Sequence, residues 1–118
     1  METALGLTKS EQSDEYLVEK LQQQLIEFSN ARHWEKFHSP KNLSMALSVE
    51  VAELVEHFQW LTEDESRQIK GNKLDEVKEE VADVLLYLLQ ICNQLEINPI
   101  DAAQKKLVKN ALKYPAID

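Results

Sequence analysis

Apolar residues recur at intervals of three and four along most of the chain, which is the spacing of one face of an α-helix. No segment alternates apolar and polar residues in the manner of a β-strand. Four main helices are predicted, at about residues 13–28, 42–61, 74–95 and 99–114. The fold class is therefore expected to be all-α, packed as a four-helix bundle or as half of one.

Residue types at the ends of these segments support the predicted boundaries. Ser13 has the side chain of a helix cap before the first segment. Asn98 followed by Pro99 is the pattern of a cap and first turn, and it marks the start of the last helix. Thr62 with Glu65 three residues later is a capping-box pattern, which predicts a short helix in the polar segment after the second helix.

The 118 residues have the length of one domain. We divide them into a flexible amino-terminal arm, residues 1–12, and a single helical domain, residues 13–118. A domain of this size buries only about two-thirds of its unfolded surface, so association with further copies would stabilise it. The single cysteine, Cys92, excludes an intramolecular disulfide and a cysteine metal cluster. It lies in an apolar run, where a core position is expected.

Charge and composition narrow the classes of partner. The formal net charge is −8, which argues against a nucleic-acid-binding protein because such a protein needs a basic surface. An anionic small substrate remains compatible, since a bound cation can reverse the local field. Only two glycines occur, so a glycine-rich phosphate loop is absent. The amino terminus lacks a signal-peptide pattern, and the apolar run 81–89 is too short for a bilayer. We therefore expect a cytoplasmic protein without membrane contact.

Carboxylates stand among the apolar positions of the second and third helices. Glu50 lies on or beside the apolar stripe of the second helix, and Glu53 neighbours it three residues later. Within 81–95 the only charged residue is Asp83, and Glu80 precedes it on the same face. Because apolar residues occupy all sides of this third helix, we expect it to be buried on most of its circumference. Asp83 is then expected to lie at least partly inside.

Burial of a carboxylate requires that it be paired, protonated or bound to a metal. The two helices contribute four acids in this position: Glu50, Glu53, Glu80 and Asp83. Without a cation these groups would repel one another, and their hard oxygen atoms suit Mg²⁺, with Mn²⁺ as a second candidate. The alternative is a solvated surface or pairing with lysines. For Glu50 and Glu53 alone we favour that alternative, whereas for Asp83 we favour a functional role.

The two spaced pairs, Glu50-x-x-Glu53 and Glu80-x-x-Asp83, resemble the metal motif of the MazG-like all-α nucleoside triphosphate pyrophosphatases. Flanking segments are similar, in the same order, to the dCTP pyrophosphatase branch of that superfamily. These segments are 32–38 (Arg-His-Trp-Glu-Lys-Phe-His), 42–43 (Asn-Leu), 58–60 (Phe-Gln-Trp) and 106–115, with Lys106, Asn110, Tyr114 and Pro115. The resemblance covers about residues 16–115 and implies a MazG-like helical fold that assembles as a homo-oligomer, either a dimer or a tetramer.

The resemblance also implies an activity, which is Mg²⁺-dependent hydrolysis of a nucleoside triphosphate to the monophosphate and pyrophosphate. The expected substrate is dCTP or a modified deoxynucleotide, and the expected role is housecleaning of the nucleotide pool. Glu50, Glu53, Glu80 and Asp83 would hold the metal ion. Glu53 and Glu50 are the candidate catalytic carboxylates, and we prefer Glu53 as the acceptor of the proton of the attacking water.

Substrate-binding roles follow from the same resemblance. Trp34 and Trp60 would flank the base, and the remaining candidates are Arg32, Lys41, Tyr87, Lys106, Asn110 and Tyr114. Each tryptophan has a core anchor as its alternative role, with about even weight. Leu25 stands where dCTP-selective relatives carry a histidine, so the resemblance does not extend to strict cytosine selectivity.

Two other functional classes compete with the enzyme. The first is a non-catalytic helical interaction module whose acids are paired with lysines and hold no metal. The second is a di-iron bundle, which needs Glu-x-x-His ligands. Neither carboxylate pair is followed by a histidine at that offset, and Glu53 with His57 is spaced by four, so we discount the di-iron reading.

Overall fold

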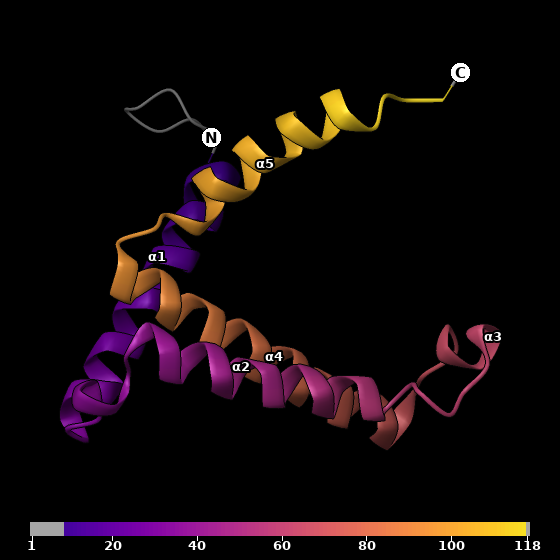
Figure 1. The fold of residues 1–118 in the computed structure, drawn as a ribbon, viewed down its shortest axis with the longest axis horizontal. Coiled ribbons are helices and arrows are strands. Elements are labelled where there is room, and N and C mark those ends of the chain that lie inside the picture. Colours follow the sequence, from indigo (N-terminus) through magenta and orange to yellow (C-terminus); the bar gives the residue numbers. More distant parts are fainter. Residues whose placement is uncertain (1–8, 118) are drawn as a thin grey trace.

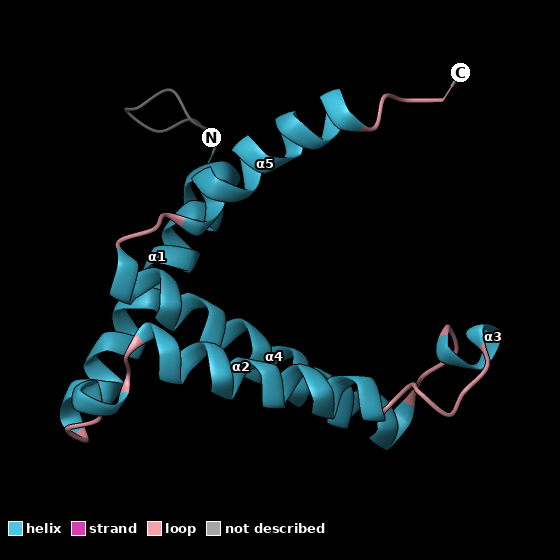
Figure 2. Cartoon of the chain, viewed as in Figure 1, coloured by secondary structure: helices cyan, strands magenta, loops and turns pink. Residues whose placement is uncertain are grey.

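A computed structural model describes residues 9–117, and all regular structure in that range is helical (Figure 2). The elements are α1 (Lys9–Ala31), the 3-10 turn η1 (Glu35–Phe37), α2 (Pro40–Glu56), α3 (Glu63–Ser66), α4 (Gly71–Leu95) and α5 (Pro99–Lys113). The predicted all-α class is confirmed. Residues 1–8 of the predicted arm lie outside the described residues, and residues 9–12 belong to α1. The predicted cap at Ser13 is wrong, because α1 already begins at Lys9.

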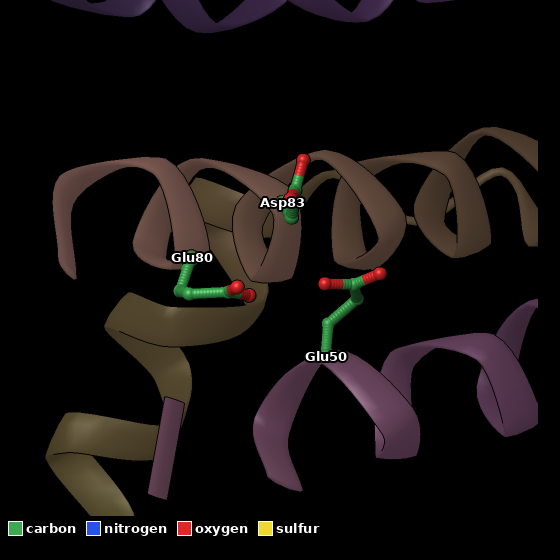
Figure 3. Close-up of side chains that lie close together, drawn as sticks. All are labelled: Glu50, Glu80 and Asp83. Atoms are coloured by element: carbon green, nitrogen blue, oxygen red, sulfur yellow. The ribbon is translucent and has the colours of Figure 1, made fainter. Parts of the chain in front are cut away.

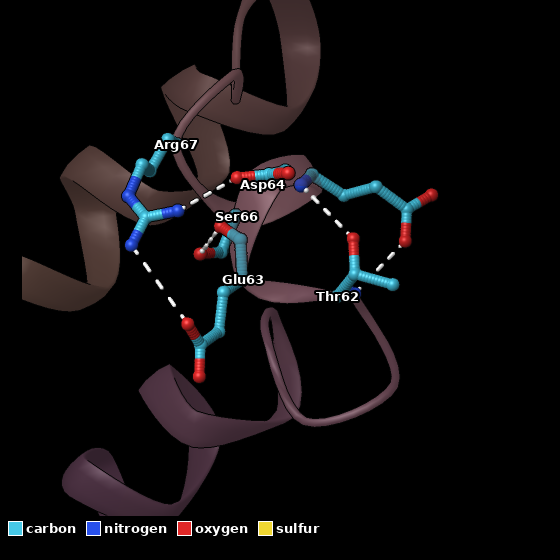
Figure 4. A network of polar contacts seen from close by, with 6 residues as sticks. Thr62, Glu63, Asp64, Ser66 and Arg67 are labelled. Atoms are coloured by element: carbon cyan, nitrogen blue, oxygen red, sulfur yellow. Dashed lines mark hydrogen bonds and ion pairs between the residues drawn. The ribbon is translucent and has the colours of Figure 1, made fainter.

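Side-chain caps form at the helix starts that the sequence predicted. The Thr62 hydroxyl accepts a hydrogen bond from the Glu65 N–H at 3.1 Å, and the Glu65 carboxylate accepts one from the Thr62 N–H at 2.9 Å (Figure 4). This reciprocal pair is the predicted capping box. At the start of α5 the Asn98 side-chain oxygen accepts hydrogen bonds from the N–H groups of Ile100 and Asp101, both at 3.1 Å. Both predictions are confirmed.

The second helix is displaced from its predicted range at both ends. The helix begins at Pro40, two residues before the predicted start. Ser39 caps it, and its hydroxyl accepts a hydrogen bond from the Asn42 N–H at 3.1 Å. The helix ends at Glu56, where the sequence predicted continuation to about residue 61. The helix ends early because the backbone N–H groups of Phe58 and Leu61 donate hydrogen bonds to carbonyls three residues earlier. Such bonds form tight turns in place of a further α-helical turn.

Three helices make the core. α2 packs along α4, and α1 packs against the carboxyl-terminal part of α4 (Figure 1). The buried apolar side chains come from all three: Leu25 of α1, Leu43 of α2, and Leu89 and Cys92 of α4. The predicted core position of Cys92 is confirmed. Two hydrogen bonds between Gln22 and Asn93, at 3.0 and 3.1 Å, join α1 to α4 beside this core.

The fourth long helix, α5, leaves the other three after Pro99 and diverges from the α2–α4 pair (Figure 1). The radius of gyration is 17.7 Å, whereas a compact domain of this length has about 13.5 Å. One chain therefore forms an open arrangement and not a closed four-helix bundle. No described helix combines the length and the apolar character needed to cross a membrane.

The expected burial of α4 on most of its circumference is wrong for the single chain. Val81, Leu85 and Leu88 remain about half exposed, at 50%, 45% and 45%. Among the described elements, α1 and α2 are the ones that pack closely on α4, and they leave its outer face uncovered.

Candidate metal centre and its surroundings

α2 and α4 bring three of the predicted acids together. Glu50 projects from α2 toward α4, which carries Glu80 and Asp83 (Figure 3). One carboxylate oxygen from each residue takes part in a group whose members all lie within 4.8 Å of one another. The arrangement follows from helical spacing, because residues three apart share a face of α4, and Glu50 lies on the face of α2 that packs against it.

Two of these carboxylates have a buried oxygen atom that accepts no hydrogen bond from the described residues. Glu50 and Glu80 are half-buried, and the Oε2 atom of each has no hydrogen-bond partner among residues 9–117. The ion pairs among the described side chains involve other acids: Glu63, Asp64, Glu76 and Asp101. Pairing with lysine, which the interaction-module alternative requires, therefore does not occur at this cluster within the described chain.

Proton affinity at the cluster reflects this crowding. The pKa of Glu50 rises from 4.5 to about 7, first because burial disfavours its charged form and then because Glu53 and Asp83 are negatively charged. The pKa of Glu80 is also raised, again first by burial and then by the charge of Glu53. A bound divalent cation would relieve both effects.

Glu53 lies beside the three closest acids without joining their group of oxygens. It is half-buried on α2, and its charge acts on both Glu50 and Glu80. All four predicted acids are therefore neighbours. Three carboxylates, two of them with a buried oxygen that has no hydrogen-bond partner among the described residues, make a donor set that fits a hard divalent cation.

Asp83 differs from its expected environment. The sequence predicted a position at least partly inside the protein, but Asp83 is exposed in the single chain. The prediction is wrong because it assumed neighbours on every side of α4, and the outer face of this helix has none within the described chain. Its oxygen nevertheless reaches Glu50 and Glu80.

The two tryptophans lie at opposite ends of α2. Trp34 precedes the helix, with its ring edge-on to Phe28 at a centroid distance of 5.6 Å and close to His38 at 6.1 Å. Trp60 follows the helix and is 86% exposed, which does not agree with a core anchor in this chain. The 17 residues of α2 span about 25 Å. One chain therefore cannot hold a single base between its own two tryptophan rings.

The other predicted substrate-binding residues fall in separate regions. Arg32 places its guanidinium 3.5 Å from the Phe28 ring centre and donates a hydrogen bond to the Phe28 carbonyl at 3.0 Å. Lys41 is exposed in the first turn of α2, and Tyr87 is half-buried one turn after Asp83 on α4. Lys106 and Asn110 are on α5, and Tyr114 is the residue that ends it. This helix packs closely on neither α2 nor α4, which carry the cluster.

One polar residue that the sequence analysis did not single out is Gln90. Its side-chain oxygen is buried and has no hydrogen-bond partner in the part of the chain that the structure describes. It lines a small cavity of about 60 Å³ together with Leu25, Ser29 and His38. The available signal was a lone amide within the apolar run of α4, one turn after Tyr87.

Comparison with known proteins decides the family. A sequence profile of the MazG-like family matches residues 45–118, which include the whole acidic cluster. The chain belongs to the MazG-like family. Its similarity to dCTP pyrophosphatase 1 extends to the human protein, at 36% identity over 106 residues, and to the bovine protein, at 33% over 105 residues. The family that the sequence suggested is thus confirmed.

Coverage differs between the relatives of this MazG-like chain. The human match takes in 88% of this chain but only 62% of that protein, so the chain spans about 62% of the length of the curated relatives it matches. A crystal structure of a pyrophosphatase from Archaeoglobus fulgidus is 49% identical, with a TM-score of 0.78. That match covers 83% of this chain and 92% of the archaeal one.

Proposed function

We propose that this member of the MazG-like family is a metal-dependent nucleotide pyrophosphohydrolase. Its substrate is a nucleoside triphosphate, dCTP or a modified deoxynucleotide, and its products are the monophosphate and pyrophosphate. The observation that carries the proposal is the meeting of Glu50, Glu80 and Asp83 within 4.8 Å without a basic partner among the described side chains. The names of the similar proteins, dCTP pyrophosphatase and pyrophosphatase, support the same reaction.

In this proposal the acidic cluster holds Mg²⁺, with Mn²⁺ as the second candidate, through Glu50, Glu80 and Asp83, and Glu53 lies beside them. The bound ion supplies Lewis acidity that offsets the negative charge of the phosphates. Glu53 accepts the proton of the attacking water, and Glu50 is the second candidate for that role. The water oxygen forms a bond to the α-phosphorus, and the bond from that phosphorus to the bridging oxygen breaks. Pyrophosphate leaves with the electron pair.

Side chains outside the cluster would bind the rest of the substrate. Trp34 offers an aromatic face that is 42% exposed, which suits stacking against a base. Tyr87 lies one turn from Asp83 on α4, and we propose that it contacts the sugar or a phosphate. Arg32 and Lys41 provide positive charge near the start of α2. Stacking alone discriminates little between bases, because every base has a π-face.

Self-association is part of the same proposal. The open shape of the chain and the half-exposed outer face of α4 both leave apolar surface that a second copy would cover. We propose a homo-oligomer, a dimer or a tetramer, located in the cytoplasm. The net charge of −8 favours a function without nucleic acid or membrane as a partner.

Replacement of Asp83 by asparagine tests the function. Pyrophosphate release is measured with Mg²⁺ over a panel of canonical and modified triphosphates. We expect Asp83→Asn to lower the rate by at least about a hundred-fold, equivalent to about 2.7 kcal/mol of lost transition-state stabilisation. Helix content by circular dichroism should remain unchanged. Glu79→Gln removes an exposed acid from the same helix and should retain activity. An unimpaired Asp83→Asn enzyme would reject the metal assignment.

Thermal melting separates the enzyme from the interaction module. A ligand that binds only the native state at a hundred times its dissociation constant stabilises by about 2.7 kcal/mol. The enzyme should therefore melt at a higher temperature with Mg²⁺ and a bound triphosphate. A flat response across the nucleotide panel would favour the module.

A further inference from the structure

The contact between α1 and α4 leaves a cavity that is lined by an amide with an unpaired oxygen. The cavity has a volume of about 60 Å³, and residues of α1, η1 and α4 line it, among them Gln90. The side-chain oxygen of Gln90 is buried and accepts no hydrogen bond from residues 9–117. An unpaired buried acceptor is unfavourable, so this oxygen requires a donor from outside the described chain.

A second amide in the lining of the same cavity has a structural role. The Asn93 amide donates a hydrogen bond to the Gln22 carbonyl at 3.1 Å, and its oxygen accepts one from the Gln22 amide at 3.0 Å. These two bonds join α4 to α1. The Gln90 oxygen has no such bond within the described chain, although Leu25 and Ser29 of α1 also line the cavity. The two amides therefore differ, because Asn93 connects the helices and Gln90 keeps a free acceptor.

Gln90 continues a line of polar side chains that includes the acidic cluster. Asp83, Tyr87 and Gln90 follow one another along α4 at spacings of four and three, so they share one face of the helix. The rise along the helix from Asp83 to Gln90 is about 10 Å. A nucleotide whose phosphates are held at the cluster can extend along this face, with its sugar beside Tyr87 and its base toward Gln90.

An aromatic side chain lies beside the same cavity. Glu35 and His38, which follow Trp34 by one and four residues, are part of the lining. The rings of Trp34 and His38 are edge-on to each other at a centroid distance of 6.1 Å, and Trp34 is 42% exposed. A base that stacks on Trp34 therefore has the cavity next to it. The cavity is much smaller than the roughly 300 Å³ of a site that encloses a whole ligand, so it admits the polar edge of a base and leaves the sugar and phosphates outside.

We propose that Gln90 is a specificity-determining residue whose side-chain oxygen accepts a hydrogen bond from the exocyclic amino group of the base. An amide oxygen accepts and cannot donate, so a base with a keto oxygen at that position leaves it unpaired. Cytosine carries an amino group at the position where uracil carries a keto oxygen, whereas stacking on Trp34 serves both rings. The identity of the substrate rests on the proposed function, and the role of Gln90 rests on the cavity and the unpaired oxygen.

The ratio of rates for two substrates tests this role. Pyrophosphate release is measured with Mg²⁺ for dCTP and for dUTP, which differ at this edge of the base, and the two values of kcat/KM are divided. The wild type should prefer dCTP by about ten-fold to a hundred-fold, which is the effect of one unmade hydrogen bond at a buried acceptor. Gln90→Leu keeps a side chain of similar size without the amide, and its ratio should fall close to one.

The matched control is Gln24→Leu, which makes the same change at an exposed amide of α1 and should keep the wild-type ratio. A purely structural role for Gln90 would lower both rates equally, so an unchanged ratio in Gln90→Leu overturns the proposal. A wild type that prefers dUTP overturns it as well. A wild-type protein that releases pyrophosphate from no triphosphate would instead contradict the proposed function.

Titration calorimetry with the α,β-imido analogues of dCTP and dUTP tests the role of Gln90 without turnover. The wild type should bind the dCTP analogue about ten-fold to a hundred-fold more tightly, and Gln90→Leu should bind both analogues alike. Equal affinities of the wild type for the two analogues, or no binding of either, would overturn the proposal even in a preparation that lacks activity. Without ligand, Gln90→Leu should melt no lower than the wild type, because it loses an acceptor that has no donor in the described chain. A clearly lower melting temperature would show that the amide serves the fold, which also overturns the proposal.

Discussion

Replacement of Glu50 by glutamine is expected to stabilise the metal-free protein at neutral and alkaline pH. The Glu50 pKa rises from 4.5 to about 7 in the folded chain, first through burial and then through the charge of Glu53. An acid whose pKa is higher in the folded state opposes folding as pH climbs, because the unfolded chain then releases its proton more readily. This penalty is absent below pH 4.5 and complete above about pH 7. Glutamine carries no charge, so Glu50→Gln removes this penalty on folding.

The size of the effect follows from the same displacement. A change from 4.5 to about 7 is equivalent to about 3 kcal/mol at full strength. Glu50 is only half-buried, and solvent screening lowers the expected gain to about 1–2 kcal/mol. For a chain of this length, such a gain raises the melting temperature by about 4–10 °C.

The assay compares thermal melts of the wild type and Glu50→Gln after removal of metal with a chelator. Protein concentration is held constant, because association shifts the melting temperature. The two proteins should melt together near pH 4.5 and separate at about pH 8, with the variant more stable. Glu56→Gln changes an exposed acid on the same helix and should have no effect at either pH. Identical curves for the wild type and Glu50→Gln at the higher pH would refute the reasoning.

Three further predictions concern the scaffold. Leu43 is only 2% exposed, so Leu43→Ala should lower the unfolding free energy by about 2–4 kcal/mol in urea titrations. A loss below about 0.5 kcal/mol would contradict its place in the core. Asn98→Ala should lower the unfolding free energy by about 1 kcal/mol, whereas Asn98→Asp should retain the cap of α5. Equal unfolding free energies for the two variants would count against the cap. Burial raises the pKa of the Cys92 thiol, so an aromatic disulfide reagent should label it only after unfolding, and rapid labelling of the native protein would exclude the buried position.

Local features of the fold were predictable because each depends on a few adjacent residues. The capping box at Thr62 and the Asn98-Pro99 start of α5 both formed as expected, since a short polar side chain next to free backbone N–H groups acts within one turn. The meeting of Glu50 with Glu80 and Asp83 was also anticipated. Spacing of three residues places two acids on one face, and the apolar stripe of each helix identifies the face that packs.

Features that depend on the number of neighbours were not predictable from one chain's pattern. A run such as 81–89 indicates that a helix will be covered, but it does not say whether the cover comes from the same chain. The exposed position of Asp83 has this origin. The direction of α5 escaped prediction for another reason, because it depends on the backbone conformation at Glu96 and not on periodicity.

Two incomplete features of the single chain have related physical causes. The cluster of Glu50, Glu80 and Asp83 combines like charges with unpartnered buried oxygens, which is unfavourable unless positive charge arrives from outside. The outer face of α4 and the exposed side chains of α5 are unfavourable unless apolar surface arrives from outside. Because Glu80 and Asp83 lie on the same helix as the uncovered apolar side chains, and Glu50 faces them from α2, positive charge and apolar surface are both needed at one place on the molecule.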